Sequence, residues 1–173
     1  KTTRVPLALL PEVSGRIVML EPRRLAARAA AERMAQTLGE DVGQTVGYRV
    51  RGDSAVGPDT RIEVVTEGIL TRMLLDDPSL DGIACVIFDE VHHAADDRAW
   101  GDSIRRAFEP SVRRLAISGT PFRSDTSAIP FVRYVLEEAA PDYEYGYGDA
   151  LSDGRVTAVL GELTTFTNQF VAD

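Results

Sequence analysis

The sequence predicts an α/β domain in which a mostly parallel sheet carries helices on both faces. Short apolar runs alternate with stretches of helical periodicity over most of the chain. The run 83–88 is apolar throughout, which is typical of a strand that is covered on both faces. The 173 residues suit one domain with a short appendage and are too few for two full domains.

The expected strands and helices cover the first 118 residues. Apolar runs predict strands at 16–20, 44–50, 62–65, 83–88 and 114–118. Helical patterns predict helices at 23–38, 67–76 and 100–109, and a short one with Pro6 near its start. Gly39 marks the end of the first long helix, and Thr66 has the position of an N-cap.

The remaining segments have weaker patterns. Turn-forming residues predict a loop over 52–59. Residues 155–160 favour a strand, and no fixed structure is expected for 161–173.

The charge of the chain narrows the class of protein. Lys and Arg total 19 and Asp and Glu total 27, a net charge of −8 that argues against a protein coating nucleic acid with its whole surface. Residues 1–61 hold 10 basic and 7 acidic side chains, so only this part offers a basic face. A composition of 44% hydrophobic and 27% charged residues excludes a wholly disordered chain.

Cysteine usage and hydropathy favour a cytoplasmic protein. Cys85 is the single cysteine, which excludes a disulfide within the chain and a cysteine-based zinc site. No apolar run approaches the ~18 residues that span a bilayer, and no signal peptide is recognisable at the start. The first residue is Lys1 rather than Met, so we expect the chain to begin inside a larger protein.

The sequence Asp-Glu-Val-His at 89–92 is the strongest local indication of chemistry. It directly follows the apolar run 83–88, and ligands of open parallel sheets bind at the carboxyl ends of strands. Adjacent acids there suit a magnesium–nucleotide site, because Mg²⁺ prefers oxygen ligands. Asp89 would hold the metal, and Glu90 would orient or deprotonate the attacking water. The alternative is that these acids only mark the end of a strand and the start of a helix, which is the more common role of an isolated acid pair.

The first three residues have the composition of the end of a phosphate-binding loop. Such a loop needs a glycine-rich backbone, then Lys for the phosphates, then Ser or Thr for Mg²⁺. Lys1, Thr2 and Thr3 supply only its last part, and the glycines are expected before residue 1. A Lys-Thr pair has almost no specificity by itself. It gains weight from its position ~90 residues before the acid pair.

Two segments are candidates for contact with a nucleic-acid backbone. Each is expected directly after a strand at a helix start, where backbone amides attract phosphate. Arginine adds a forked donor that matches a phosphate group. The candidate residues are Pro22, Arg23 and Arg24 in one segment, and Thr66, Glu67 and Gly68 in the other. Taken alone, a solvated arginine pair and an ordinary helix cap are simpler explanations.

A polar triplet ends the strand at 114–118. Ser118, Gly119 and Thr120 are expected to join a polar network with His92 at the carboxyl edge of the sheet, although a simple turn has the same composition. His92 and His93 are adjacent and point apart, which disfavours a metal site.

Three alternating tyrosines occur late in the chain. On a strand, Tyr143, Tyr145 and Tyr147 would share one face. Such a face stacks nucleic-acid bases in some proteins, but a core or interdomain contact is the more common role.

The order of these sites resembles the first motor domain of superfamily-two DEAD/DEAH-box helicases. It runs Lys-Thr, Pro-Arg-Arg, Thr-Glu-Gly, Asp-Glu-Val-His and Ser-Gly-Thr. The resemblance implies a RecA-like P-loop NTPase domain that binds ATP and Mg²⁺. The implied roles are nucleotide and metal binding for Lys1, Thr2, Asp89 and Glu90, and catalysis for Asp89, Glu90 and His92. Backbone contact is implied for Arg23, Arg24, Thr66 and Gly68, and coupling for Ser118 and Thr120.

Two parts of the chain resemble different helicases. Residues 1–90 look like bacterial DEAH-box helicases of the HrpB type, through Glu-Pro-Arg-Arg-Leu-Ala-Ala-Arg at 21–28 and Val-Thr-Glu-Gly-Ile-Leu at 65–70. Residues 89–160 look like phage and actinobacterial DNA helicases related to type III restriction motors, through Ser-Gly-Thr-Pro-Phe-Arg-Ser-Asp at 118–125. The first resemblance implies RNA or either nucleic acid as substrate, and the second implies DNA.

The resemblance also implies how a longer protein is organised. Residues 1–135 correspond to the helicase ATP-binding domain, truncated in its phosphate loop, and 136–173 lead towards a missing second motor domain. Arginines of that domain complete the nucleotide site, and an arginine finger is worth ~10³–10⁵ in rate. The chain alone is therefore expected to hydrolyse ATP weakly or not at all.

Two other functions compete with this one. One is a non-catalytic fragment that binds nucleic acid or a partner protein. The other is a small-molecule kinase, which is disfavoured because the sequence has no evident lid or acceptor pocket.

Overall fold

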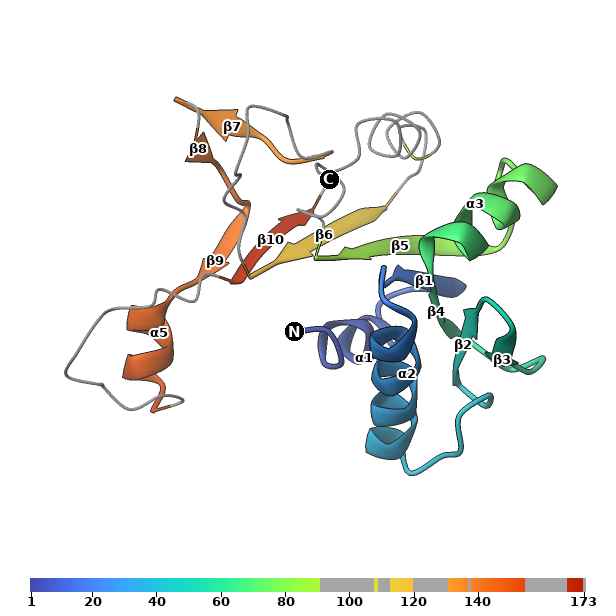
Figure 1. Cartoon of the computed structure of the whole chain (residues 1–173). Helices are drawn as coiled ribbons and strands as arrows, with labels where there is room; N and C mark the ends of the chain where they lie inside the picture. The colour runs from blue at the N-terminus through green and yellow to red at the C-terminus, as the bar shows by residue number, and fades with distance from the viewer. Residues whose placement is uncertain (91–107, 109–112, 120–130, 137, 155–167, 173) are drawn as a thin grey trace. The chain divides into compact units, whose positions relative to one another are not determined.

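The computed structural model describes residues 1–90, 108, 113–119, 131–136, 138–154 and 168–172 (Figure 1). These residues form two compact units. The first contains 1–89, Phe108 and 113–115, and the second contains Glu90 and the described residues of 116–172. The candidate nucleotide and nucleic-acid residues of the first 89 positions therefore lie within one unit.

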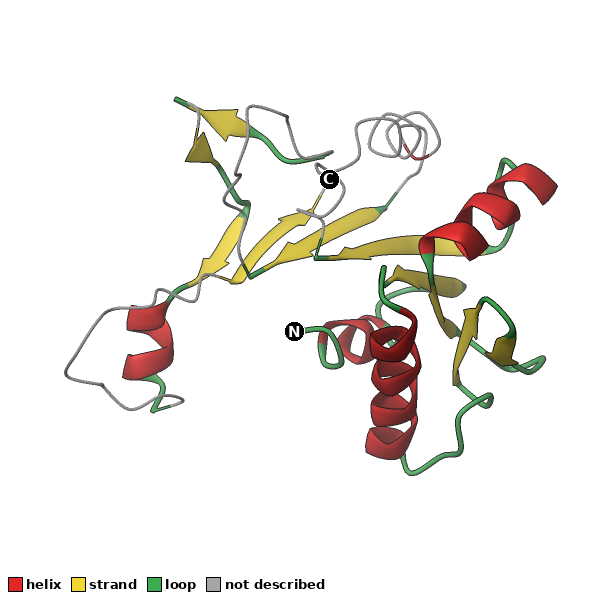
Figure 2. Cartoon of the chain, in the orientation of Figure 1, coloured by secondary structure: helices red, strands yellow, loops and turns green. Residues whose placement is uncertain are grey.

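A twisted sheet forms the centre of the first unit, as the strand arrows of Figure 2 show. Its strand order is β3-β2-β4-β1-β5. The strands are β1 (Arg16–Leu20), β2 (Val46–Val50), β3 (Asp53–Ala55), β4 (Ile62–Val65) and β5 (Ile83–Asp89). All neighbours pair in parallel except β3, which is antiparallel to β2. The amide of Val86 in β5 donates to the carbonyl of Arg113, directly before β6 (Arg114–Ser118).

Helices lie on both sides of this sheet (Figure 1). Helices α1 (Val5–Leu9) and α2 (Arg24–Leu38) lie on one side, and α3 (Glu67–Asp76) lies on the other. Helix α2 packs on β2 and β4 through small buried side chains, and small residues let a helix approach a sheet closely. It ends at Gly39, whose φ of 73° is the left-handed conformation that glycine adopts without a Cβ clash.

The core of the first unit consists of strand residues and a few helical ones. Ile17, Met19, Ile62 and Ile87 are completely or almost completely buried. Phe88 meets Phe108 edge-to-face, with ring centroids 5.3 Å apart and an interplanar angle of 80°. Edge-to-face pairs are favoured by the ring quadrupoles and add to the energy of apolar burial.

A carboxylate is also buried within the sheet. Glu63 of β4 is 2% exposed. Its Oε1 lies 2.9 Å from Nε of Arg49 in β2, and its Oε2 lies 3.9 Å from Nη1 of Arg16 in β1. A buried charge is costly unless it is paired, and these two half-exposed arginines pair with it. The contact ties three adjacent strands together.

The described part of the second unit contains short elements. They are β7 (Tyr134–Val135), β8 (Glu138–Ala139), β9 (Tyr143–Tyr145), α5 (Tyr147–Ser152) and β10 (Asn168–Ala172). β7 pairs antiparallel with β8, and β10 pairs antiparallel with β9. The start of α5 is capped by Asp149, whose carboxylate accepts the amide of Gly146 at 2.8 Å.

Most of the predicted elements of the first unit are confirmed. The α/β class and the strands at 16–20, 62–65, 83–88 and 114–118 are present, and β2 is two residues shorter than expected. The helices after Arg23 and Thr66 are confirmed to within one residue. No helix in the described ranges is both long and apolar enough to cross a membrane.

Three predictions differ from the structure. The stretch 52–59 is not all loop, because Asp53–Ala55 pairs with β2 as β3. Tyr143 and Tyr145 lie on β9, but Tyr147 begins α5, so the three tyrosines do not share a strand face. Residues 168–172 form β10, where the sequence predicts no structure. The predicted helix 100–109, apart from Phe108, and the predicted strand 155–160 lie outside the described residues, and the domain boundary near 135 stays a prediction.

Gly47 in β2 provides a test of the packing at the edge of the sheet. A Cβ at this position would lie 2.9 Å from Cγ1 of Val56 and 3.1 Å from Cγ2 of Thr60, and would collide with the carbonyl oxygen of Ala55. We expect Gly47→Ala to lower the free energy of unfolding by about 1–3 kcal/mol, as overpacking does. The midpoint of urea unfolding measures it.

Gly68→Ala is the matched control for this substitution. A Cβ there meets no atom within 4 Å. Alanine also has the higher helix propensity, so stability should stay constant or rise by up to ~1 kcal/mol. Equal unfolding midpoints for Gly47→Ala and the wild-type protein would contradict the close packing of Gly47 against Ala55, Val56 and Thr60.

Candidate functional site

The carboxyl ends of β4, β1 and β5 lie level with one another. Leu20 is in register with Val65 of β4 on one side and with Phe88 of β5 on the other. The next residues, Glu21, Thr66 and Asp89, therefore lie along one edge of the sheet. All three are at least nine-tenths buried. This is the edge at which open parallel sheets bind ligands.

Lys1 and Asp89 meet at this edge. Nζ of Lys1 lies 3.7 Å from Oδ1 of Asp89, and the two side chains are 11% and 0% exposed. The carbonyl of Lys1 accepts the amides of Arg4 and Val5, so the turn that leads into α1 holds Lys1 in place. Thr2 and Thr3 lie in this same turn. The structure thus brings together two predicted nucleotide-binding residues that are far apart in sequence.

Glu21 is a further member of the site that the sequence analysis did not single out as a candidate. It is 2% exposed. Burial raises the pKa of its carboxyl above the ordinary value, and the nearby charge of Asp89 also raises it. The amide and the guanidinium of Arg23 act in the opposite direction. The sequence did contain a signal for this residue, because Glu21 is the first polar residue after an apolar strand that ends at this edge.

The two predicted backbone-binding segments begin their helices at the same edge. Arg23 and Arg24 are exposed at the start of α2. Glu67 and Gly68 are exposed in the first turn of α3, after the buried Thr66. Thr66 has extended backbone angles, as an N-cap does, but its side chain makes no capping hydrogen bond. The space above Gly68 is open, because a Cβ at this position would meet no atom within 4 Å.

The other predicted residues are placed in part. Glu90 follows Asp89 with a φ of 52°, a left-handed conformation that is costly for a residue other than glycine. Ser118 is buried at the end of β6, and Gly119 comes next. Glu90 and Ser118 belong to the second unit. His92 and Thr120 lie outside the described residues.

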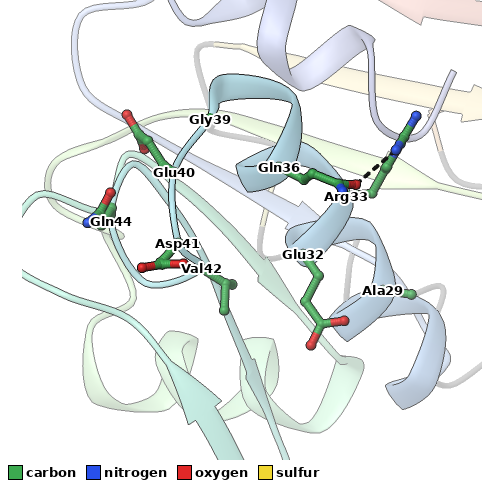
Figure 3. A pocket seen from close by; sticks show the side chains of 9 residues that line it. All are labelled: Ala29, Glu32, Arg33, Gln36, Gly39, Glu40, Asp41, Val42 and Gln44. Atoms are coloured by element: carbon green, nitrogen blue, oxygen red, sulfur yellow. Dashed lines mark hydrogen bonds between the residues drawn. The ribbon is translucent and has the colours of Figure 1, made fainter.

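A surface hollow lies elsewhere, at the end of α2 and the loop that follows it (Figure 3). Glu32, Gln36, Glu40 and Asp41 are among its lining residues. Helix α2 starts at the carboxyl edge and runs back across the sheet, so this hollow is at the opposite, amino edge. The polar residues of the candidate site do not line it.

The donors at the carboxyl edge suit Mg²⁺ carried by a nucleotide. Within the described ranges, no group of three or more His, Cys, Asp or Glu side chains could hold a metal ion. Magnesium in phosphoryl-transfer sites binds one or two carboxylates, keeps several waters and takes the remaining oxygens from phosphates. Asp89 and the turn that carries Thr2 and Thr3 fit that pattern. They do not form a metal site made of protein ligands alone.

Comparison with known proteins identifies relatives of this chain. The sequence pattern of the family described as "DEAD/DEAH box helicase" matches residues 1–129. The ATP-dependent RNA helicase HrpB of Escherichia coli is 57% identical over 94 residues, which cover 53% of this chain and 12% of HrpB. The uncharacterized protein Rv2917 of Mycobacterium tuberculosis is 54% identical over 81 residues, which cover 43% of this chain and 13% of that protein.

A solved structure agrees with these sequence matches. The crystal structure of the Escherichia coli DEAH/RHA helicase HrpB matches 71% of this chain and 16% of that chain, with a TM-score of 0.61 and 45% identity. The chain thus spans only a small fraction of the relatives that it matches.

The buried carboxyl of Glu21 predicts a pH dependence of stability. Its pKa is raised in the folded protein, so the folded state holds this proton to higher pH than the unfolded state, whose value is near 4.5. The contribution of Glu21 to stability is therefore full below that value and falls as pH rises towards the folded pKa. Glu21→Gln cannot ionise, so its unfolding free energy relative to wild type should increase from mildly acidic to neutral buffer.

Urea unfolding of both proteins at each pH measures this difference. Glu32→Gln, which changes an exposed carboxyl of α2, controls for the loss of one negative charge. A difference between Glu21→Gln and wild type that stays constant over this range would contradict the burial of an ionisable Glu21.

Proposed function

The chain belongs to the DEAD/DEAH box helicase family and matches part of its first motor domain, and on this premise we propose that it binds Mg–ATP and a nucleic-acid backbone in an ATP-dependent helicase or translocase. The observation that carries the proposal is the meeting of Lys1 and Asp89, 3.7 Å apart at the carboxyl edge of the sheet. A cation and a carboxylate at this distance match the two charges of a magnesium–phosphate group.

At the nucleotide end, each residue has a role that its chemistry supports. The ammonium of Lys1 binds phosphate oxygens, and the hydroxyl of Thr2 and the carboxylate of Asp89 are the oxygen ligands for the metal. Mg²⁺, when bound, would neutralise part of the negative charge of the phosphates. Glu90 orients the attacking water and accepts its proton. His92 and the segment 118–120 couple this site to the rest of the motor.

At the nucleic-acid end, the contacts are to phosphate and carry no sequence information. Arg23 and Arg24 supply forked donors, and the open first turn of α3 supplies amides. The likeness of residues 1–90 to HrpB-type proteins favours RNA. The resemblance of residues 89–160 to DNA motors rests on the sequence alone and stays a prediction, and it favours DNA. We therefore propose a contact with the backbone that accepts single strands of either kind.

A second motor domain is the proposed partner of this one. Its arginines would complete the nucleotide site, and ATP turnover would open and close the cleft between the two domains. Family members work as longer proteins, and this chain matches 12% of HrpB. We therefore expect weak or no ATP hydrolysis by the chain alone, and a cytoplasmic location stays a prediction.

Glu90→Gln tests the catalytic assignment. In a longer chain, with the glycines of the phosphate loop before Lys1 and a second motor domain after the present sequence, it should abolish nucleic-acid-stimulated ATP hydrolysis. ATP binding should persist, because glutamine keeps the size of the side chain and loses only its basicity. Steady-state phosphate release and nucleotide titration measure the two effects, and unchanged turnover would refute the role of Glu90.

Gly68→Ala tests the nucleic-acid end. A methyl group over the first turn of α3 should hinder a phosphate, and we expect roughly fivefold weaker binding of single-stranded RNA, on the order of one lost hydrogen bond. Fluorescence anisotropy measures the affinity. Gly148→Ala is the matched control, because Gly148 also occupies the second position of a helix and has nothing within 4 Å of a Cβ. Equal affinities of both variants would place the backbone contact elsewhere.

A further inference from the structure

Glu21 connects the two ends of the site through its contacts with Arg23. Its Oε1 accepts the backbone amide of Arg23 at 3.2 Å. The same oxygen lies 3.5 Å from Nε of Arg23. Both contacts are made by a carboxylate that is 3% exposed, whereas the side chain of Arg23 is 69% exposed. A rigid, buried group therefore holds an exposed arginine by its backbone and by its side chain.

The position of Glu21 is itself fixed by the sheet. Its amide donates to the carbonyl of Val65 at the end of β4, which continues the pairing of β1 with β4 by one residue. Its charge interacts with that of Asp89, the residue at the end of β5. Glu21 thus lies between Asp89, at the end of β5, and Arg23, the first arginine of the proposed nucleic-acid contact.

We propose that Glu21 is a positioning residue, which orients Arg23 towards the nucleic-acid backbone from a place next to the nucleotide-binding Asp89. An unanchored arginine loses the entropy of several rotatable bonds when it binds phosphate, and an anchor lowers that cost. Because Glu21 contacts Nε and the backbone amide of Arg23, the two terminal guanidinium nitrogens of Arg23 stay available to donate to phosphate.

This inference rests on the proposed function, in which Arg23 contacts nucleic acid. A double-mutant cycle on the present chain tests it, with Arg23→Ala, Glu21→Ala and the double variant, and with the affinity for single-stranded RNA measured by anisotropy. If Glu21 acts through Arg23, Glu21→Ala should weaken binding roughly two- to tenfold, the range of one hydrogen bond. It should add no further loss to Arg23→Ala.

The conservative variant separates positioning from general stability. Glu21→Gln keeps an oxygen that accepts the Arg23 amide, so its affinity should stay within about twofold to threefold of wild type. Glu32→Ala controls for the loss of a carboxylate from the neighbouring helix, since Glu32 is exposed and pairs with Arg28 at 2.8 Å. Its affinity should equal that of wild type.

Salt dependence gives a readout that a purely structural role would not change. Loss of one phosphate contact lowers the slope of log affinity against log salt concentration by about one. Glu21→Ala and Arg23→Ala should show the same reduced slope, with Glu21→Gln close to wild type.

The outcomes distinguish failure of the inference from failure of the proposed function. Additive losses from Glu21→Ala and Arg23→Ala, or a Glu21→Ala variant that binds like wild type while Arg23→Ala binds weakly, would overturn the positioning role alone. An Arg23→Ala variant that binds like wild type would overturn the proposed nucleic-acid contact, and the inference with it. Absence of RNA binding by the wild-type chain would do the same.

Discussion

The register of three parallel strands is the constraint on which the candidate site depends. Leu20 pairs with Val65 and with Phe88, so β4, β1 and β5 end at one level. The residue that follows each apolar run is polar, namely Glu21, Thr66 or Asp89. Because the strands end at one level, these three residues lie at the same edge. A shift of one residue in this pairing would turn the side chains to the other face of the sheet and separate Lys1 from Asp89. The apolar faces of these strands, which are almost completely buried, fix the register.

Buried carboxylates occur in this unit together with cations. Asp89 is close to Lys1, Glu21 to Arg23, and Glu63 to Arg49. A buried carboxylate without such a partner would be protonated or would lower the stability of the fold, so the pairs contribute to stability as well as to the proposed function. In the first two pairs the cation belongs to a segment with a proposed ligand. In the proposed function, Lys1 would exchange one anion for another when it binds phosphate, whereas Arg23 would keep its contact with Glu21.

The fold of the first unit could be read from the sequence because its signals are local. An apolar run such as 83–88 predicts a strand, and Gly39 predicts a helix end, without knowledge of distant residues. The strand β3 was not predicted, because it depends on pairing with β2 across a tight turn and its own residues are turn formers. Tyr147 was misplaced for a related reason, since an alternating pattern does not show that a helix begins at Gly146 and its Asp149 cap.

The site was predictable to a similar extent. Lys1, Asp89 and the two helix starts were expected from residue type and order, and their meeting at one edge follows from parallel topology. Glu21 was not singled out, because its role depends on the depth at which β1 ends between its two neighbours. Burial and the contact with Arg23 are properties of the assembled sheet.

Magnesium-dependent nucleotide binding tests the central claim most directly. A fluorescent ATP analogue should bind the wild-type chain saturably and only with Mg²⁺, and Lys1→Ala and Asp89→Asn should each abolish this binding while the fold persists. Equal binding by all three proteins would show that ATP is held elsewhere. Binding of single-stranded nucleic acid without any binding of Mg–ATP would contradict the account and identify the chain as a non-catalytic nucleic-acid-binding fragment.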